Sequence, residues 1–129
     1  MEASGKEKGS QVKERNIQQR IRLDHSKAKT RLFNNDQGVA EVNGRRISYG
    51  LGNGSTDLVG VHTVMITPEM VGREVGIAVF AEVKTDIGRV EPHQQAFMDQ
   101  MARMGCISGV VRSSKDMAAL LETCRSDET

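Results

Sequence analysis

Two charged residues close an otherwise apolar run at Val79-Phe-Ala-Glu-Val-Lys84. Alternate side chains of a strand point to the same face, so the carboxylate of Glu82 and the ammonium of Lys84 share one side. Burying such a pair without a task costs free energy. Together with Asp57, which opens the preceding apolar run, these groups can hold a divalent cation and an attacking water beside a phosphate. We therefore expect metal-assisted chemistry at this strand end.

The cofactor that this set predicts is a hard divalent cation. Mg²⁺ takes oxygen ligands in octahedral geometry and keeps several waters, so Asp57, Glu82 and the backbone carbonyl of Val83 suffice to hold it. Mn²⁺ accepts the same kind of ligand. Lys84 would be a fixed cation beside the charge that develops in the transition state. The sequence thus predicts Mg²⁺ or Mn²⁺ as the cofactor and requires no protein nucleophile.

Each of these residues also has a simpler interpretation. Glu82 and Lys84 can form an ordinary ion pair on an exposed edge strand, where such pairs contribute about 0–1 kcal/mol. The apolar residues before them argue against full exposure. Asp57 follows Gly54-Ser-Thr and can be a turn or cap residue. The three residues taken together favour the metal site over these alternatives.

The elements that must position these residues follow from the spacing of apolar side chains. In chain order we predict a helix at 12–32, a hairpin at 38–49 that turns at Asn43-Gly44, strands at 57–66 and 76–85, a helix from Pro92 to 104, a strand at 107–111, and a helix begun by Ser113. The order is α-β-β-β-β-α-β-α. The strands at 57–66 and 76–85 can pair antiparallel, and the later strand-helix-strand series implies a parallel pair. The fold class is therefore α/β, with a mixed β-sheet core flanked by helices.

Length and composition limit the organisation of the chain. Its 129 residues, 14.2 kDa in mass, suffice for one domain. We expect a disordered lead-in at 1–10, the folded domain at 11–125 and a tail at 126–129. A net charge of +1 neither demands nor excludes a polyanionic partner. The two cysteines lack CxxC spacing, which favours reduced thiols over a disulfide or a zinc site.

Several classes of partner are excluded at this level. No apolar stretch approaches the roughly 18 residues of a membrane span, and no apolar signal core is present. We therefore expect a cytoplasmic, intracellular protein without a membrane partner. The three glycines at 50, 52 and 54 lack the G-x-x-x-x-G-K-[ST] pattern, which excludes a nucleotide cofactor in a phosphate-binding loop.

Four segments carry a resemblance to a known family: Gly54-Ser-Thr-Asp57, Glu82-Val-Lys84, Gly88-Arg-Val-Glu-Pro-His-Gln94 and residues 105–112. Together they resemble the VRR-NUC branch of the PD-(D/E)XK nuclease superfamily, in its stand-alone phage or prophage form. The resemblance covers roughly residues 14–121. It implies a restriction-endonuclease-like fold in which Asp57 and Glu82 bind the metal and Lys84 is catalytic.

The resemblance also extends the site to two helices. A first-helix acid, matched here by Glu14, completes the acidic metal-binding set. Gln18 and Gln19 lie nearby, so a shift of one helical turn would change that choice. Gln94 matches the family's helix glutamine, which touches the catalytic site or the DNA backbone.

Basic residues provide candidates for contact with DNA. Arg45 and Arg46 at the hairpin, with Arg89 and Arg112 near the site, can follow a phosphate backbone. The first helix adds Lys13, Arg15, Arg20 and Arg22. A solvated charged face is the alternative for these helix residues.

The activity that follows is a Mg²⁺- or Mn²⁺-dependent DNA endonuclease that hydrolyses phosphodiester bonds. One site per chain cuts one strand at a time, so a homodimer with two-fold symmetry suits branched DNA. A Holliday-junction resolvase is the expected type. The alternatives are a monomeric flap or nicking nuclease, a non-catalytic DNA-binding module on a nuclease fold, and a small structural or regulatory α/β protein.

Overall fold

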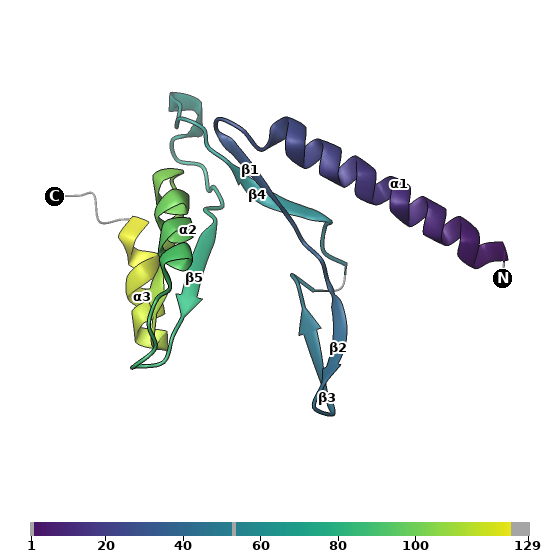
Figure 1. Ribbon diagram of the computed structural model, residues 1–129. Helices are drawn as coiled ribbons and strands as arrows, with labels where there is room; N and C mark the ends of the chain where they lie inside the picture. Colours follow the sequence, from purple (N-terminus) through teal and green to yellow (C-terminus); the bar gives the residue numbers. More distant parts are fainter. Residues whose placement is uncertain (1, 53, 125–129) are drawn as a thin grey trace. The chain divides into compact units, whose positions relative to one another are not determined.

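The computed structural model describes residues 2–52 and 54–124. The chain divides into two compact units, residues 1–64 and residues 65–129 (Figure 1). Each unit has its own strand pairing, and each is described by itself. The tail expected at 126–129 lies outside the described residues.

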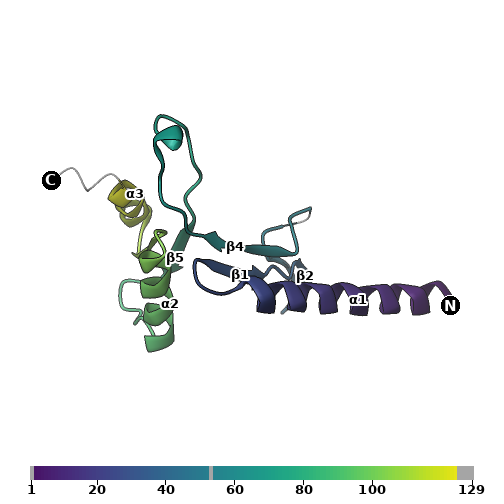
Figure 2. The ribbon, with the colours of Figure 1, turned by 90° about the horizontal axis from the view of Figure 1, so that it is seen from above.

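The first unit begins with a long helix and a strand that the sequence analysis missed. Helix α1 spans Glu2–His25, and strand β1 spans Thr30–Asn34. Both ribbon views show α1 running alongside β1 (Figures 1 and 2). The prediction of one helix over 12–32 was therefore wrong at its end. Residues 2–10, which we expected to be disordered, are the first turns of α1.

A local interaction explains where the helix gives way to the strand. Ala28 has a positive φ of 55°, which an α-helix does not accommodate. The hydroxyl of Ser26 accepts a hydrogen bond from Leu32 N–H at 2.9 Å. This bond turns the chain back, so that Leu32, expected at the end of the first helix, lies in β1.

Strand β1 pairs antiparallel with β4, Leu58–His62, in a register that joins Asn34 to Leu58. The end of β1 is thereby held next to the start of β4, where Asp57 lies. The predicted hairpin is confirmed as β2, Gly38–Val42, and β3, Arg45–Tyr49. Asn43 and Gly44 both have positive φ, as a two-residue hairpin turn of the primed type requires.

The second unit contains the predicted strand-helix-strand series. Its elements are the short 3₁₀ helix η1, Pro68–Met70, strand β5, Val79–Val83, helix α2, Pro92–Arg103, strand β6, Ile107–Val111, and helix α3, Ser114–Glu122. Strands β5 and β6 pair in parallel, as predicted. The buried apolar side chains among the described residues are Met98, Met101, Ile107 and Val111. The core therefore lies in this unit, between β6 and the helices.

The two helices cover opposite faces of the β5–β6 pair. Phe97 of α2 meets Phe80 of β5 edge to face, with ring centroids 5.6 Å apart. On the other face, a Cβ added to Gly109 would lie 3.1 Å from Leu120 of α3. Glu82 lies two residues after Phe80 in β5. Its side chain is therefore on the same face as that of Phe80, the face covered by α2.

The predicted α/β class is confirmed, with antiparallel and parallel pairs that agree with a restriction-endonuclease-like fold. The observed order is α-β-β-β-β-β-α-β-α, in which β1 is the addition. The predicted pairing of β4 with β5 would join the two units and stays a prediction. Among residues 2–52 and 54–124, no helix combines the length and apolar character needed to cross a membrane.

Candidate functional site

Glu82 and Lys84 form a partly buried ion pair in the second unit. Lys84 Nζ lies 3.6 Å from Glu82 Oε1, and the two side chains are 19% and 33% exposed respectively. The edge-strand alternative requires a solvent-exposed pair, which these fractions do not support. Their pairing in a partly shielded position instead keeps a negative and a positive charge fixed side by side at the end of β5.

Gln94 connects this pair to helix α2. Its Nε2 donates a hydrogen bond to Glu82 Oε1 at 2.8 Å, and its Oε1 accepts one from Glu91 N–H at 2.9 Å. A backbone N–H can only donate, so the amide must present its oxygen to Glu91 and its nitrogen to Glu82. The capping box of α2 therefore fixes the orientation of the group that contacts the carboxylate.

The turn after Lys84 is held by an arginine from the end of β6. Arg112 Nη1 donates to the carbonyls of Thr85 and Gly88, the second at 2.9 Å. Lys84 N–H also donates to Val111 O at 3.1 Å. The guanidinium of Arg112 thus makes intramolecular contacts here, and its predicted contact with DNA stays a prediction.

The first unit holds Asp57 at an open cavity of about 280 Å³. Asp57 is exposed and shares this cavity with Glu14 and Gln18 of α1. The structure therefore brings Glu14 and Asp57 to one place, while Gln18 stands one turn further along the same helix face. It makes no choice between Glu14 and Gln18 as the residue that completes the site.

Three residues after β1, which the sequence analysis did not single out, line the same cavity: Asn35, Asp36 and Gln37. The sequence analysis missed these residues because it assigned 12–32 to one helix and so did not expect a strand to end just before residue 35. An available signal was the succession of polar residues directly after Leu32-Phe33, at the end of a β-compatible segment.

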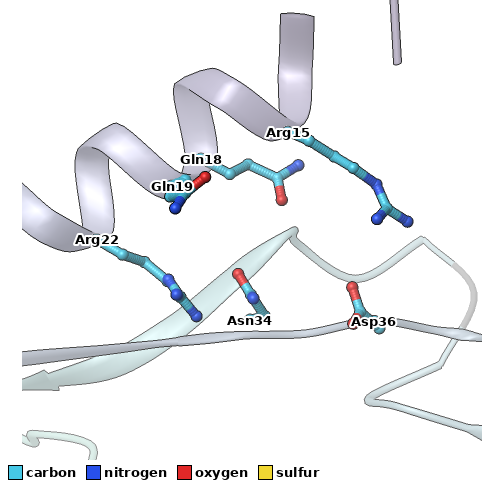
Figure 3. Close-up of a pocket in the computed structure, with 6 residues that line it drawn as sticks. All are labelled: Arg15, Gln18, Gln19, Arg22, Asn34 and Asp36. Atoms are coloured by element: carbon cyan, nitrogen blue, oxygen red, sulfur yellow. The ribbon is translucent and has the colours of Figure 1, made fainter. Parts of the chain in front are cut away.

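A second cavity of about 190 Å³ adjoins the first and shares Arg15, Gln18 and Asp36 with it. Figure 3 shows Arg15 and Arg22 reaching from α1 toward the strand that carries Asn34. Gln19 lines this second cavity. Two guanidinium groups at one groove are suited to phosphate oxygens.

The other predicted basic contacts are accessible. Arg45 and Arg46 lie on β3, and Arg89 lies in the turn before α2; all three are exposed. Val83 ends β5 and is 74% exposed. Its carbonyl as a metal ligand stays a prediction.

The chemistry of the donor set fits a hard divalent cation, since Asp57, Glu82 and Glu14 offer carboxylate oxygens. Asp57 and Glu14 belong to the first unit and Glu82 to the second. Within the described part of the chain, no three acidic, histidine or cysteine side chains converge on one point. A single ion bound by the whole set is therefore a proposal.

Two groups outside this set have shifted pKa values. Hydrogen bonds from its own backbone and from Thr67 lower the pKa of Glu69. Burial raises the pKa of the Cys106 thiol. Cys106 and Cys124 are both free, which confirms the expectation of unpaired thiols.

The comparisons with known proteins give one match. The family model for the VRR-NUC domain matches residues 10–115, a range that includes Glu14, Asp57, Glu82, Lys84 and Gln94. No curated protein and no solved structure matches the chain.

Proposed function

Because the chain belongs to the VRR-NUC family, whose domains are nucleases of the PD-(D/E)XK type, we propose that it is a divalent-metal-dependent endonuclease. As a member of that family it acts on DNA. The observation that carries the metal-dependent proposal is the shielded Glu82–Lys84 pair, whose carboxylate is oriented by Gln94.

The proposed roles follow from the contacts of each side chain. Glu82 and Asp57 supply carboxylate oxygens to the ion, with Glu14 and the Val83 carbonyl as further ligands. A bound Mg²⁺ or Mn²⁺ would lower the pKa of a water and neutralise charge on the phosphate. Lys84 holds a positive charge beside the reacting phosphate, where a preorganised cation favours the transition state. Gln94 keeps the Glu82 carboxylate in one orientation.

DNA binding is assigned to basic residues of the first unit. Arg45 and Arg46 stand on an exposed hairpin, and Arg15 and Arg22 line the groove between α1 and β1. Arg89 and Arg112 are further candidates in the second unit. Contacts of this kind go to the phosphate backbone and do not read base sequence.

The proposed substrate is branched DNA, cut by a homodimer in the manner of a Holliday-junction resolvase in the cytoplasm. One site per chain favours this assembly, because a two-fold pair places two sites in related orientations for two strands. A flap or nicking nuclease acting as a monomer is the competing outcome.

The test uses labelled four-way junction, flap, single-stranded and linear duplex DNA with Mg²⁺, Mn²⁺ or EDTA. We expect cleavage with either metal and none with EDTA, and a rate lowered about 10²–10³-fold by Lys84→Ala. Asp57→Asn should also abolish most cleavage. The matched controls are Lys115→Ala on α3 and Asp24→Asn on α1, which alter exposed charges elsewhere.

Each outcome separates the candidates. Two symmetric cuts in the junction, with a dimeric mass in solution, support the resolvase. If a monomer cuts flaps or makes single nicks, the protein is a flap or nicking nuclease and not a resolvase. If neither wild type nor Lys84→Ala cleaves any substrate while both bind DNA, the chain is a non-catalytic binding module, and equal cleavage by the two removes the proposed role of Lys84.

A further inference from the structure

The loop that carries Asp57 joins β3 to β4, and its described residues, 50–52 and 54–57, belong to no helix or strand. It is rich in glycine, and Gly50 has a φ of +79°. A Cβ at Gly50 would collide with the carbonyl oxygen of Asp36. A loop of this composition needs an external constraint if it is to hold a side chain in place.

Asn35 provides that constraint from the end of β1. Its side-chain Nδ2 donates to Thr56 O at 2.6 Å and to Ser55 Oγ at 2.9 Å. Its Oδ1 accepts from Leu51 N–H at 3.0 Å. Its backbone N–H donates to the carbonyl of Asp57 itself at 2.8 Å. One residue therefore binds both ends of the loop.

Among the described residues, Asn35 is the one polar or charged residue that is buried, with 8% of its surface exposed. Buried amides are retained where their donors and acceptors are satisfied. Here both amide hydrogens and the oxygen have partners in the loop. An aspartate at this position would lack the two N–H donors, and a leucine would lack both the donors and the oxygen acceptor. The asparagine side chain therefore matches the hydrogen-bonding groups of this loop.

Gln37 and Ser55 extend the constraint. Gln37 Nε2 donates to Ser55 O at 2.9 Å, and Ser55 Oγ donates to Gly52 O at 2.6 Å. The side-chain bonds of Asn35 and Gln37 cross 16 to 21 residues of sequence. They join the end of β1 to the start of β4, on the side where Asp57 meets Glu14 at the cavity.

From this network we propose that Asn35 is a positioning residue that sets the place of the Asp57 carboxylate for the metal ion. The proposal rests on the proposed function, in which Asp57 is a ligand. Groups that orient a ligand act through it, and their removal typically costs about 10–100-fold in metal affinity. A loop already held in place also loses less conformational freedom when the ion binds.

The test is Asn35→Leu, which keeps the number and branching of the side-chain heavy atoms, removes every side-chain hydrogen bond and adds no carboxylate to the cavity. Mn²⁺ is titrated into the DNA-free protein and followed by electron paramagnetic resonance. Hydrogen exchange of the amides at 51–57 is measured on the same samples. The matched control is Ser26→Ala, which removes the side-chain bonds to the backbone of Leu32, in the middle of β1.

We expect Asn35→Leu to raise the Mn²⁺ midpoint by about tenfold or more and to speed exchange across the loop. Cleavage should return toward the wild-type rate as metal is added. Ser26→Ala should loosen β1 and leave the Mn²⁺ midpoint unchanged. If Asn35→Leu does not fold, the same two measurements are made on the milder variant Ser55→Ala, for which we expect a smaller rise in the Mn²⁺ midpoint.

Two results overturn the inference: a wild-type Mn²⁺ midpoint in a folded variant of the network, or an equal rise in Ser26→Ala. If a folded variant of the network has the wild-type Mn²⁺ midpoint while Asp57→Asn no longer binds Mn²⁺, the positioning role of Asn35 is refuted and Asp57 remains a metal ligand. If Asp57→Asn binds Mn²⁺ as the wild type does, Asp57 is not a ligand, and the proposed metal site falls along with the inference.

Discussion

The substitution Gln94→Glu separates the two hydrogen bonds that Gln94 makes. A glutamate keeps an oxygen acceptor for Glu91 N–H, so the capping box of α2 is retained. It loses the Nε2 donor that lies 2.8 Å from Glu82 Oε1 and places a second carboxylate there. The change therefore acts on the site and spares the helix start.

The size of the effect follows from the bond that is lost. Hydrogen bonds to a charged group contribute about 1.5–3 kcal/mol. At about 1.36 kcal/mol per factor of ten, this predicts a fall in cleavage rate of roughly 10- to 150-fold. Repulsion between the two carboxylates adds to the loss. The melting temperature should also fall, because the lost bond and the repulsion act in the folded protein, whereas the start of α2 keeps its cap.

The assay compares single-turnover cleavage and thermal unfolding for three variants. Gln94→Ala loses both bonds, so it should lose activity and about 0.5–2 kcal/mol of stability. Gln95→Ala is the control, since Gln95 bonds to Asp99 on the exposed side of the same helix. Wild-type cleavage by Gln94→Glu, with the fold intact, would refute the role of Gln94 in orienting Glu82.

Three further predictions concern other parts of the chain. Arg45→Ala and Arg46→Ala should weaken DNA binding for all sequences and reduce the slope of log K against log salt by about 0.9 per lost phosphate contact, measured by fluorescence anisotropy; an unchanged slope argues against these contacts. Arg112→Ala should free the turn after β5 and lower the cleavage rate even when the protein is saturated with DNA, whereas a variant with the wild-type rate would show that the turn needs no support. Iodoacetamide at neutral pH should modify exposed Cys124 before Cys106, whose pKa is raised by burial and whose thiolate fraction grows only as pH rises; mass spectrometry that finds the reverse order contradicts this.

Local sequence patterns predicted those elements whose formation depends on near neighbours. Asn43-Gly44 predicted the hairpin because its two positive φ angles are what a two-residue turn needs. Pro92 and Gly105 marked the limits of α2 for the same kind of reason. Strand β1 was missed because its apolar residues also matched a helical spacing. The contact that ends the helix, from Ser26 to Leu32, is invisible in such a pattern.

The candidate site divides in the same way. The types and spacing of Glu82 and Lys84 were enough to predict two opposite charges on one side of a strand end, since alternation along a strand is a local property. Gln94 was placed near the site through family resemblance, and the resemblance does not say which atom faces Glu82. That orientation depends on the backbone of Glu91, at the start of α2.

The sequence by itself determined the chemical groups of this protein: two carboxylates and a lysine at strand ends, a glutamine on the helix that follows, and a fold of the α/β class. Tertiary structure alone decided what orients them. Gln94 contacts Glu82 across 12 residues, Asn35 reaches Thr56 across 21, and Arg112 reaches Thr85 across 27. Hydrogen bonds over such separations form only after strands and helices have paired, so no periodicity in the chain encodes them.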